Sequence, residues 1–227
     1  MNRTNPKRAG KAREIARAAL EQFAQMGFVA ASLEKIAATA GIGKSTIYEY
    51  YKNKEELFVA AVEEACEGWF NDIREICEQT RDPIERLARI AASFMDCADY
   101  PPKAFQRFFF EILMQTITEG GVFFTRKHFI REVHQKVLRN IADILLTGVS
   151  RGELKPEIAK DAEKIAVTFL AFMDGMVLNS LVAEGYIDVE AQIAFFLKNL
   201  EPILRAPARS EEPGRDAQRD QDSKDKR

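Results

Sequence analysis

The 227-residue sequence predicts an all-α protein, and three observations support that class. Apolar residues recur at helical spacing, as in Ile15, Ala19 and Phe23 and again in Leu57 and Ala61. No segment alternates apolar with polar residues in the manner of a strand, and no Asn-Gly hairpin dipeptide occurs. The eight prolines separate long proline-free stretches, as expected if prolines mark helix starts and breaks.

About nine helices are expected in chain order. Ser32 is an expected N-cap of the second helix, and Asp82 precedes Pro83 at the start of the fifth. After Leu204 the composition becomes charged and lacks aromatic residues, which predicts a disordered tail. The expected helices are 8–26, 33–40, 44–51, 54–79, 83–98, 102–117, 121–151, 157–183 and 188–201. The expected domains are 1–54, 55–204 and the tail 205–227.

The composition limits the class of protein and indicates its cellular compartment. With 46% hydrophobic residues, 12 Gly and 3 Cys, the chain is neither collagen-like, disulfide-stapled nor wholly disordered. No signal-peptide pattern occurs near the start, and Cys66, Cys77 and Cys97 form no CxxC pair, so a reducing cytoplasm is expected. The apolar stretch 165–183 has Asp174 at its centre, which favours a buried or interface helix over a membrane span.

The formal net charge of −2 conceals an uneven distribution. Residues 1–54 hold ten Lys and Arg against four acids, a balance of +6. Residues 55–204 hold 16 bases against 25 acids, and the tail holds seven against six. A basic N-terminal module on an acidic body is typical of a protein that binds phosphates at one end.

The segment 33–51, LEKIAATAGIGKSTIYEYY, predicts a helix–turn–helix. Its two short helical patterns are separated only by residues 40–43. Gly41 supplies the positive φ that so tight a turn needs, and Ala37 is small where the helices must cross closely. The apolar wedge between the two helices is expected from Ile36, Ile42 and Ile47.

A helical wheel of the second helix separates two faces. Ile47 and Tyr51 fall toward the core, whereas Ser45 and Glu49 point outward. The outward face is short, polar and tyrosine-bearing, which suits a major groove better than a plain solvated surface. Ser45 and Glu49 are expected at base edges. The residues expected at phosphates are Lys44, Thr46, Tyr48, Tyr50 and Lys54. The expected DNA-binding residues are Ser32, Lys44, Ser45, Thr46, Tyr48, Glu49, Tyr50 and Lys54.

Residues 11–62 resemble the DNA-binding domain of the TetR family of bacterial one-component repressors. Gly43 departs from the family pattern, which usually has Ser at the cap of the recognition helix. The resemblance is carried by Ile15, Ala18, Ala19, Phe23, Gly27, Phe28, Ser32, Ile36, Ala37, Ala40, Gly41, Lys44, Thr46, Ile47, Tyr48, Tyr50, Tyr51, Lys54, Glu56 and Leu57.

This resemblance implies a ligand-responsive transcriptional regulator, a repressor that binds a near-palindromic double-stranded operator as a homodimer. A small-molecule effector would bind the helical body and release the DNA, through a shift of the helix expected at 54–79. The resemblance places the dimer interface on the last two long helices, where the candidates are Phe169, Met176, Ile193, Phe196 and Leu197.

The body is rich in Phe and Met, which indicates either ordinary core packing or a pocket for a largely apolar or aromatic molecule. Arg107, Glu111 and Asp174 are the candidate polar anchors. The candidate pocket residues are Phe94, Met95, Phe105, Phe109, Met114, Phe123, Phe172, Met173 and Asp174.

Three other functions fit the sequence less well. A redox-responsive repressor would use the cysteines, a helical enzyme would need convergent titratable groups, and an interaction protein would not need the pattern at 33–51. His128 and His134 lie about 240° apart on a helix and cannot share a metal. No Gly-rich phosphate loop and no GxSxG motif occurs, so no catalytic residue, metal or cofactor is expected.

Overall fold

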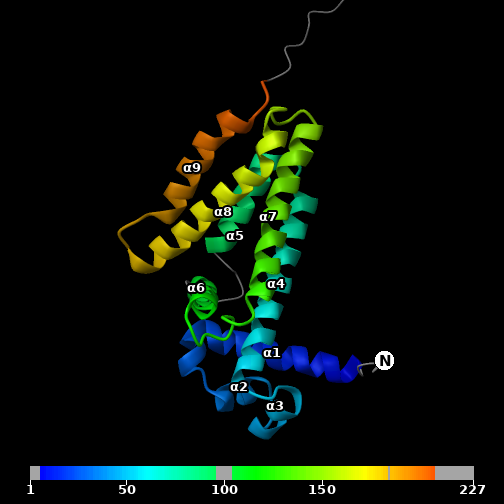
Figure 1. Cartoon of the computed structure of the whole chain (residues 1–227), viewed down its shortest axis with the longest axis vertical. Coiled ribbons are helices and arrows are strands. Elements are labelled where there is room, and N and C mark those ends of the chain that lie inside the picture. Colours follow the sequence, from blue (N-terminus) through cyan, green and yellow to red (C-terminus); the bar gives the residue numbers. More distant parts are fainter. Residues whose placement is uncertain (1–5, 96–103, 184, 208–227) are drawn as a thin grey trace, which may run out of the picture.

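The computed structural model describes residues 6–95, 104–183 and 185–207, and within these residues all regular structure is α-helical (Figure 1). The prediction of an all-α fold is confirmed for this part of the chain. The helices are α1 Pro6–Ala30, α2 Leu33–Thr39, α3 Lys44–Tyr50, α4 Lys54–Gln79, α5 Pro83–Met95, α6 Ala104–Ile117, α7 Lys127–Ser150, α8 Ile158–Val182 and α9 Val189–Leu204.

Buried apolar side chains form two clusters. The N-terminal core joins α1–α3 and the first half of α4, and it also includes Ala104 and Phe108 of α6 and Phe123. The body core joins α5, α7, α8 and α9 with the second half of α4. Helix α4 therefore contributes to both cores. Figure 1 shows it running from the α1–α3 end into the body. The sequence predicts a domain boundary after residue 54. The N-terminal core extends beyond that residue into α4 and α6.

Glycines explain the two largest differences in helix ends. At Gly27 the backbone takes φ 74° and ψ 168°, so α1 consists of two helical parts that meet at this residue instead of one helix ending at 26. Helix α7 begins at Lys127 rather than 121, because Gly120 has φ 81° and Gly121 packs against the backbone of Gln115. Residues 96–98 and 102–103 of the expected fifth and sixth helices lie outside the described residues.

The end of α9 differs from the expectation because a proline is accommodated in its last turn. Helix α9 continues past Pro202 to Leu204. The side-chain ammonium of Lys155 donates hydrogen bonds to the carbonyl oxygens of Pro202 and Ile203, at 2.8 and 3.0 Å. These are carbonyls that no helical N–H can satisfy, so Lys155 caps this end.

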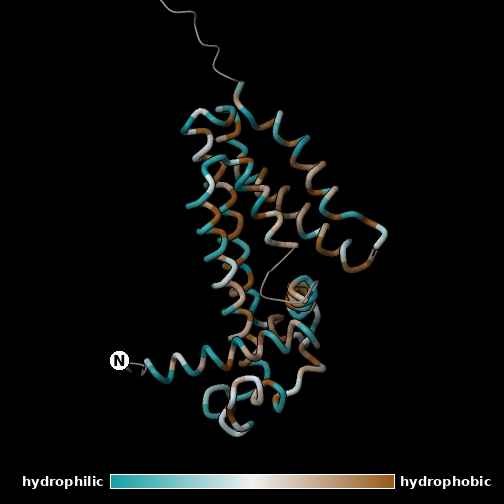
Figure 2. Tube along the Cα trace, turned by 180° about the vertical axis from the view of Figure 1, so that it is seen from behind, coloured by the Kyte–Doolittle hydropathy of each residue, from teal (hydrophilic) through white to brown (hydrophobic). Residues whose placement is uncertain are grey.

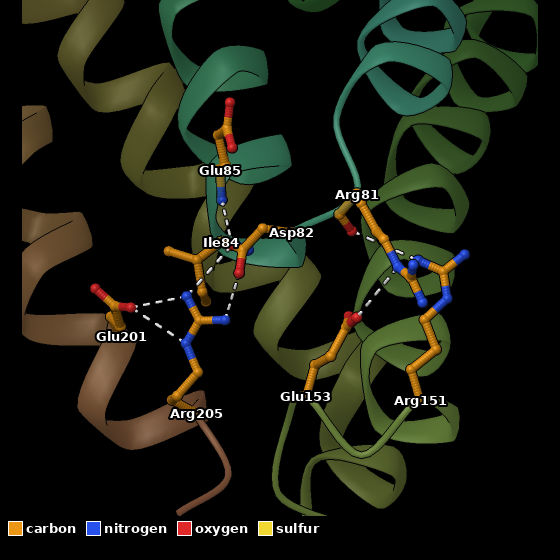
Figure 3. Close-up of polar contacts among 8 residues, drawn as sticks. All are labelled: Arg81, Asp82, Ile84, Glu85, Arg151, Glu153, Glu201 and Arg205. Atoms are coloured by element: carbon orange, nitrogen blue, oxygen red, sulfur yellow. Dashed lines mark hydrogen bonds and ion pairs between the residues drawn. The ribbon is translucent and has the colours of Figure 1, made fainter. Parts of the chain in front are cut away.

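The expected tail is tied down at its first residue (Figure 3). Arg205 pairs with Asp82 and with Glu201, whose Oε1 lies 2.8 Å from its Nη2. Asp82 also accepts hydrogen bonds from the backbone N–H groups of Ile84 and Glu85, both at 2.9 Å, and so caps α5 as expected. The start of α5 and the end of α9 are thereby joined. Residues 208–227 lie outside the described part.

Helix α8 is, by length and composition, apolar enough to cross a membrane, and it is the single such helix among the described residues. One side of it packs into the body core through Ala166, Phe169 and Met173. Its opposite side carries exposed Val167, half of whose surface is accessible, and Val182. The helix therefore has one covered and one uncovered apolar side.

Candidate DNA-binding surface and ligand cavity

The turn between α2 and α3 is built as the sequence predicts. Gly41 has φ 64°, and its N–H donates to the carbonyl of Ala38 at 3.1 Å. The N–H of Ile42 donates to the carbonyl of Ala37 at 2.9 Å, which closes the turn. Ile36 and Ile47 are completely buried between the helices, as expected. The apolar wedge thus fixes which face of α3 points outward.

The outward face of α3 carries Ser45, Tyr48 and Glu49. All three are exposed, and Tyr48 keeps 51% of its surface accessible to solvent. Within the described residues the side chains of Tyr48 and Glu49 make no hydrogen bond or ion pair. A phenol and a carboxylate on a short projecting helix are available for hydrogen bonds with phosphates and base edges.

The other predicted DNA-binding residues are engaged inside the chain. The hydroxyl of Ser32 accepts from the N–H of Lys35 and so caps α2. Lys44 pairs with Glu34, and this hydrogen bond lowers the pKa of the exposed Glu34 carboxyl to about 2. The ammonium of Lys54 donates to the carbonyl of Val29 at 3.0 Å. Thr46 is half-buried. A phosphate would compete with Glu34 for Lys44, whereas Lys54 holds the end of α1.

The first turns of α1 place basic residues beside the helix–turn–helix. A helical wheel of α3 alone could not identify them. The guanidinium of Arg8 lies 5.0 Å from the ring centroid of Tyr50, and its Nη2 donates to the carbonyl of Glu49 at 2.5 Å. Lys11 donates to the carbonyl of Ala40 at 3.4 Å. The basic count of residues 1–54 contained this signal, but only the fold shows that α1 lies beside α3. In Figure 2 the projecting start of α1 is mostly hydrophilic.

Ion pairs connect α1 to the long helix α4. Arg13 Nε lies 2.6 Å from Glu64 Oε1, and its Nη2 lies 2.6 Å from Glu67 Oε2. Arg17 Nε lies 3.1 Å from the other oxygen of Glu64. The Glu64 side chain is only 10% exposed, so this pairing is partly shielded from water. A movement of α4 would therefore carry α1 with it.

A partly open cavity of about 120 Å³ lies between α4, α5, α6, α7 and α8. Among its lining residues, Trp69 donates a hydrogen bond to Ser93 Oγ at 3.2 Å and packs its ring edge-on against Phe94 at 4.7 Å. The lining is almost wholly apolar and comprises Val62, Ala65, Cys66, Trp69, Phe94, Phe105, Phe108, Phe109, Ile112, Leu113, Ile130, Val133, His134, Val137, Leu170 and Asp174.

Four of the nine predicted pocket residues line this cavity, namely Phe94, Phe105, Phe109 and Asp174. The other five lie elsewhere. Phe123 is completely buried in the N-terminal core, and Met173 is completely buried in the body core. Phe172 stacks on Phe196, Met114 is exposed, and Met95 packs against the body core.

Of the two other proposed polar anchors, Arg107 is exposed, and Glu111 accepts a hydrogen bond from Gln115 at 2.9 Å. Neither residue lines the cavity. Trp69, Leu113 and His134 do line it but were not predicted, because a sequence pattern shows that a residue is inward-facing without showing what it faces.

A larger open groove of about 540 Å³ lies on the outside of α4, α5 and α7. Charged side chains such as Arg74, Lys136 and Asp143 line it. An open groove of mixed charge offers a small apolar molecule little burial, so the apolar, aromatic-lined cavity is the better candidate for an effector.

The outward faces of α8 and α9 carry exposed apolar residues. Phe195 is 66% exposed and Leu178 is 40% exposed, and the remaining members are Val167, Val182 and Ile203. In contrast, the predicted interface residues Phe169 and Ile193 are 1% and 8% exposed and belong to the chain's own core. They leave little surface for contact with a partner. Met176, Phe196 and Leu197 are half-buried against the same core.

The two described free cysteines have shifted pKa values. Burial raises the pKa of the Cys66 thiol to about 11 and raises the pKa of Cys77 above its usual range. Both thiols are therefore protonated at neutral pH and react slowly with oxidants. Cys97 lies outside the described residues. Within the described ranges, no three His, Cys, Asp or Glu side chains are arranged to hold a metal ion.

Comparisons with known proteins agree with this architecture. A family model described as bacterial regulatory proteins of the TetR family matches residues 15–61, and one described as the tetracyclin repressor-like C-terminal domain matches residues 103–188. The HTH-type transcriptional regulator BetI of Rhizobium meliloti is 24% identical over 192 residues, 83% of this chain and 87% of that protein. The activator FasR of Mycolicibacterium smegmatis is 27% identical over 92 residues, 40% of this chain and 42% of FasR, so the match spans less than half of that relative.

Solved structures share the fold. A TetR transcriptional regulator from Chloroflexus aurantiacus superposes with a TM-score of 0.72 at 21% identity, covering 89% of this chain and all of that one. A transcriptional regulator from Saccharomonospora viridis in complex with choline gives 0.70 at 16% identity, covering 88% of this chain and all of that one. The helix–turn–helix geometry, the helical body and both family matches establish that this chain belongs to the TetR family of bacterial transcriptional regulators.

Proposed function

We propose that this protein is a cytoplasmic, dimeric repressor that binds a near-palindromic operator and leaves it when a small, largely apolar molecule occupies the body. The observation that carries the proposal is the outward face of α3. Ser45, Tyr48 and Glu49 are exposed there on a basic module, within the segment that matches the TetR model. A regulatory role is proposed rather than a catalytic one, since family members are transcriptional regulators.

The proposed dimer pairs the outward faces of α8 and α9 with those of a second copy. The exposed apolar residues Val167, Leu178 and Phe195 would be covered there. Burial of an apolar helix face against a partner is favourable by roughly 25 cal/mol per Å². Two copies related by a twofold axis would present two α3 helices to successive major grooves, with half-sites one helical turn apart. The uncovered side of α8 is thus assigned to a protein partner and not to lipid.

The proposed signal passes through α6 as well as α4. Phe108 lines the cavity and also belongs to the N-terminal core, where its ring lies 5.8 Å from that of Phe58 on α4. A molecule that displaces Phe108 would change the packing of α6 against α1, while the ion pairs of Arg13 link α1 to α4. The effector acts only if it binds the DNA-free arrangement more tightly.

Selection of duplexes from a randomised library tests the DNA-binding proposal, because the operator sequence then emerges from the experiment itself. We expect enrichment of a near-palindrome whose half-site centres lie about 10–10.5 base pairs apart, or a multiple of that. In gel shifts, Tyr48→Ala should weaken binding to selected and random duplexes alike, and Glu49→Ala should change the preferred bases. Glu78→Ala, an exposed residue in the last turn of α4 and outside α3, α8 and α9, is the matched control and should change neither. No enrichment, or no effect of either α3 variant, would contradict the proposal.

A redox-responsive repressor is the second candidate, and the raised pKa values of Cys66 and Cys77 speak against it. Peroxide treatment should leave operator affinity unchanged. A loss of binding that dithiothreitol reverses would favour the redox function instead.

A further inference from the structure

Asp174 is an unusual member of the effector cavity. It is the one carboxylate among the described residues that line the cavity, and it stands on α8 opposite aromatic rings of α4, α5 and α6. Its Oδ1 is buried and has no hydrogen-bond partner among the described residues. A buried polar atom without a partner is costly to a fold, so a ligand that satisfies it removes that cost.

The surroundings leave Asp174 few ways to be satisfied within the chain. Burial raises the pKa of the Asp174 carboxyl, and the nearby His134 on α7 opposes that rise. Those two residues and Cys66 are the titratable groups of the lining. Because the Cys66 thiol is protonated at neutral pH, it supplies no charge. No lysine or arginine faces the carboxylate from the described cavity wall.

The aromatic residues that line the cavity also favour a positively charged ligand. Trp69, Phe94, Phe105 and Phe109 present π systems to the same small space. The face of an aromatic ring attracts a cation, and the attraction grows where water is excluded. A carboxylate and several rings together form a site for positive charge carried on an apolar body.

We infer that the effector of the proposed regulator is an apolar amine, whose ammonium group pairs with Asp174 while its hydrocarbon part fills the aromatic cavity. The inference rests on the proposed function for its regulatory meaning. An anionic molecule, such as a carboxylic acid, would meet the Asp174 oxygen with a like charge. A neutral alcohol can satisfy one lone pair but leaves the charge unpaired.

The volume of the cavity limits the size of the ligand. An apolar cavity of roughly 150 Å³ in a protein holds a benzene molecule. The cavity of about 120 Å³ is of that order, so one ring with a short chain is the appropriate probe, with small adjustments of the lining side chains. Three probes of matched shape differ only in their polar end: 3-phenylpropylamine, 3-phenylpropanol and 3-phenylpropanoate.

The chain contains a single tryptophan, Trp69, and it lines the cavity. Its fluorescence therefore reports binding at this site directly. In titrations of the full-length protein at neutral pH, we expect the amine to bind about 10- to 100-fold more tightly than the alcohol, the range of hydrogen bonds to charged groups. The carboxylate should bind more weakly than the alcohol. Equal affinities for the three compounds, or a preference for the carboxylate, would overturn the inference.

The variant Asp174→Asn tests the assigned residue at nearly constant volume. Its preference for the amine over the alcohol should fall to about threefold or less, while its affinity for the alcohol should change little. Glu163→Gln removes an exposed carboxylate from the same helix, outside the cavity, and should retain the wild-type preference. An Asp174→Asn protein that keeps the preference would contradict the assignment. The comparison of the three probes on the wild-type protein stands even if this variant fails to fold.

The experiments distinguish a failure of the ligand inference from a failure of the proposed regulatory function. If the amine is preferred but does not release the selected operator, the release step of the proposed function is wrong and the chemistry of the cavity stands. If operator binding is intact and the three probes bind equally, the ligand class is wrong and the DNA-binding proposal stands.

Discussion

At the scale of single residues, burial without a partner determines how Asp174 behaves. In the folded protein the carboxyl is partly buried among apolar side chains, so its charged form loses hydration, and the nearby His134 offsets only part of that loss. The consequence is a raised pKa, the reverse of Asp82, whose carboxyl is also partly buried. There, hydrogen bonds from Arg205 and from backbone N–H groups outweigh burial and lower the pKa.

The raised pKa of Asp174 predicts a pH-dependent stability. Because the folded pKa exceeds the unfolded one, Asp174 costs no stability below its ordinary pKa of about 3.9, and its cost grows as pH rises through the raised pKa. We therefore expect Asp174→Asn to gain stability over the wild type as pH increases from about 4 to 7. Urea unfolding at several pH values measures the difference. A difference that stays constant across this range would contradict the burial of the charge.

The residue scale also shows what a sequence can assign to a site. The outward residues Ser45 and Glu49 could be predicted because a seven-residue helix anchored by Ile47 and by its C-cap Tyr51 has only one orientation. The contact that Lys54 makes could not be predicted, since its hydrogen bond to the carbonyl of Val29 depends on how α1 ends. The cavity required the packing of five helices, and so Trp69 and His134 escaped prediction.

At the scale of helices and their contacts, α7 crosses close to α5 at Gly148. A Cβ atom at this position would lie 2.8 Å from two side-chain atoms of Leu154 and 3.0 Å from Pro83. Leu154 is almost completely buried and cannot move aside freely. This contact sets the spacing between the end of α7 and the start of α5.

The variant Gly148→Ala should therefore lower the free energy of unfolding by about 1–3 kcal/mol, the usual cost of overpacking, despite the better helix propensity of alanine. Gly68→Ala on α4 is the matched control, because no atom lies within 4 Å of its added Cβ. That control should gain up to about 1 kcal/mol. Thermal melts of both proteins compare the effects. A stabilised Gly148→Ala protein would show that the crossing is looser than described.

Asp82 joins two elements, since it caps α5 and pairs with Arg205 beyond α9 (Figure 3). Asp82→Ala loses both contacts and should cost about 1–2 kcal/mol of stability. Asp82→Asn keeps the cap and loses the charge, so its cost should be clearly smaller. Chemical denaturation at neutral pH measures the two values. Equal costs would mean that the pairing with Arg205, rather than the cap, carries the stabilisation.

Helix ends show where sequence reasoning stops at this scale. Eight of the nine helix starts could be placed within two residues, because caps, prolines and apolar periodicity are local signals. The start of α7 differs from its expected position by six residues, since the chain from Gly120 to Arg126 folds into turns against Gln115. Burial of Phe123 in the N-terminal core also holds these turns in place, and the apolar period does not reveal that contact.

At the scale of the whole molecule, the basic residues and the exposed apolar surface lie in different parts of the chain. The basic module lies at the α1–α3 end, and the exposed apolar faces of α8 and α9 lie on the body (Figures 1 and 2). The net charge of −2 describes neither end. Two copies joined through the body would leave both basic modules free for DNA.

Phe195→Asp tests this arrangement of the dimer. The side chain is 66% exposed, so the substitution should spare the fold of one chain while placing a charge in the proposed interface. We expect monomers by light scattering and a loss of operator binding. Ile117→Asp, at a position 67% exposed on α6, is the control and should remain dimeric. A dimeric Phe195→Asp protein would contradict the proposed interface.

The most direct measurement of the central claim is the affinity of the full-length protein for its selected operator, compared with the same duplex after one half-site has been scrambled. If two recognition helices of a dimer read two half-sites, scrambling several base pairs of one should weaken binding by at least about 100-fold, at about 1–3 kcal/mol for each mismatched pair. Fluorescence anisotropy at fixed salt measures both affinities. Equal affinity for the two duplexes would show that this chain does not read DNA as a symmetric dimer.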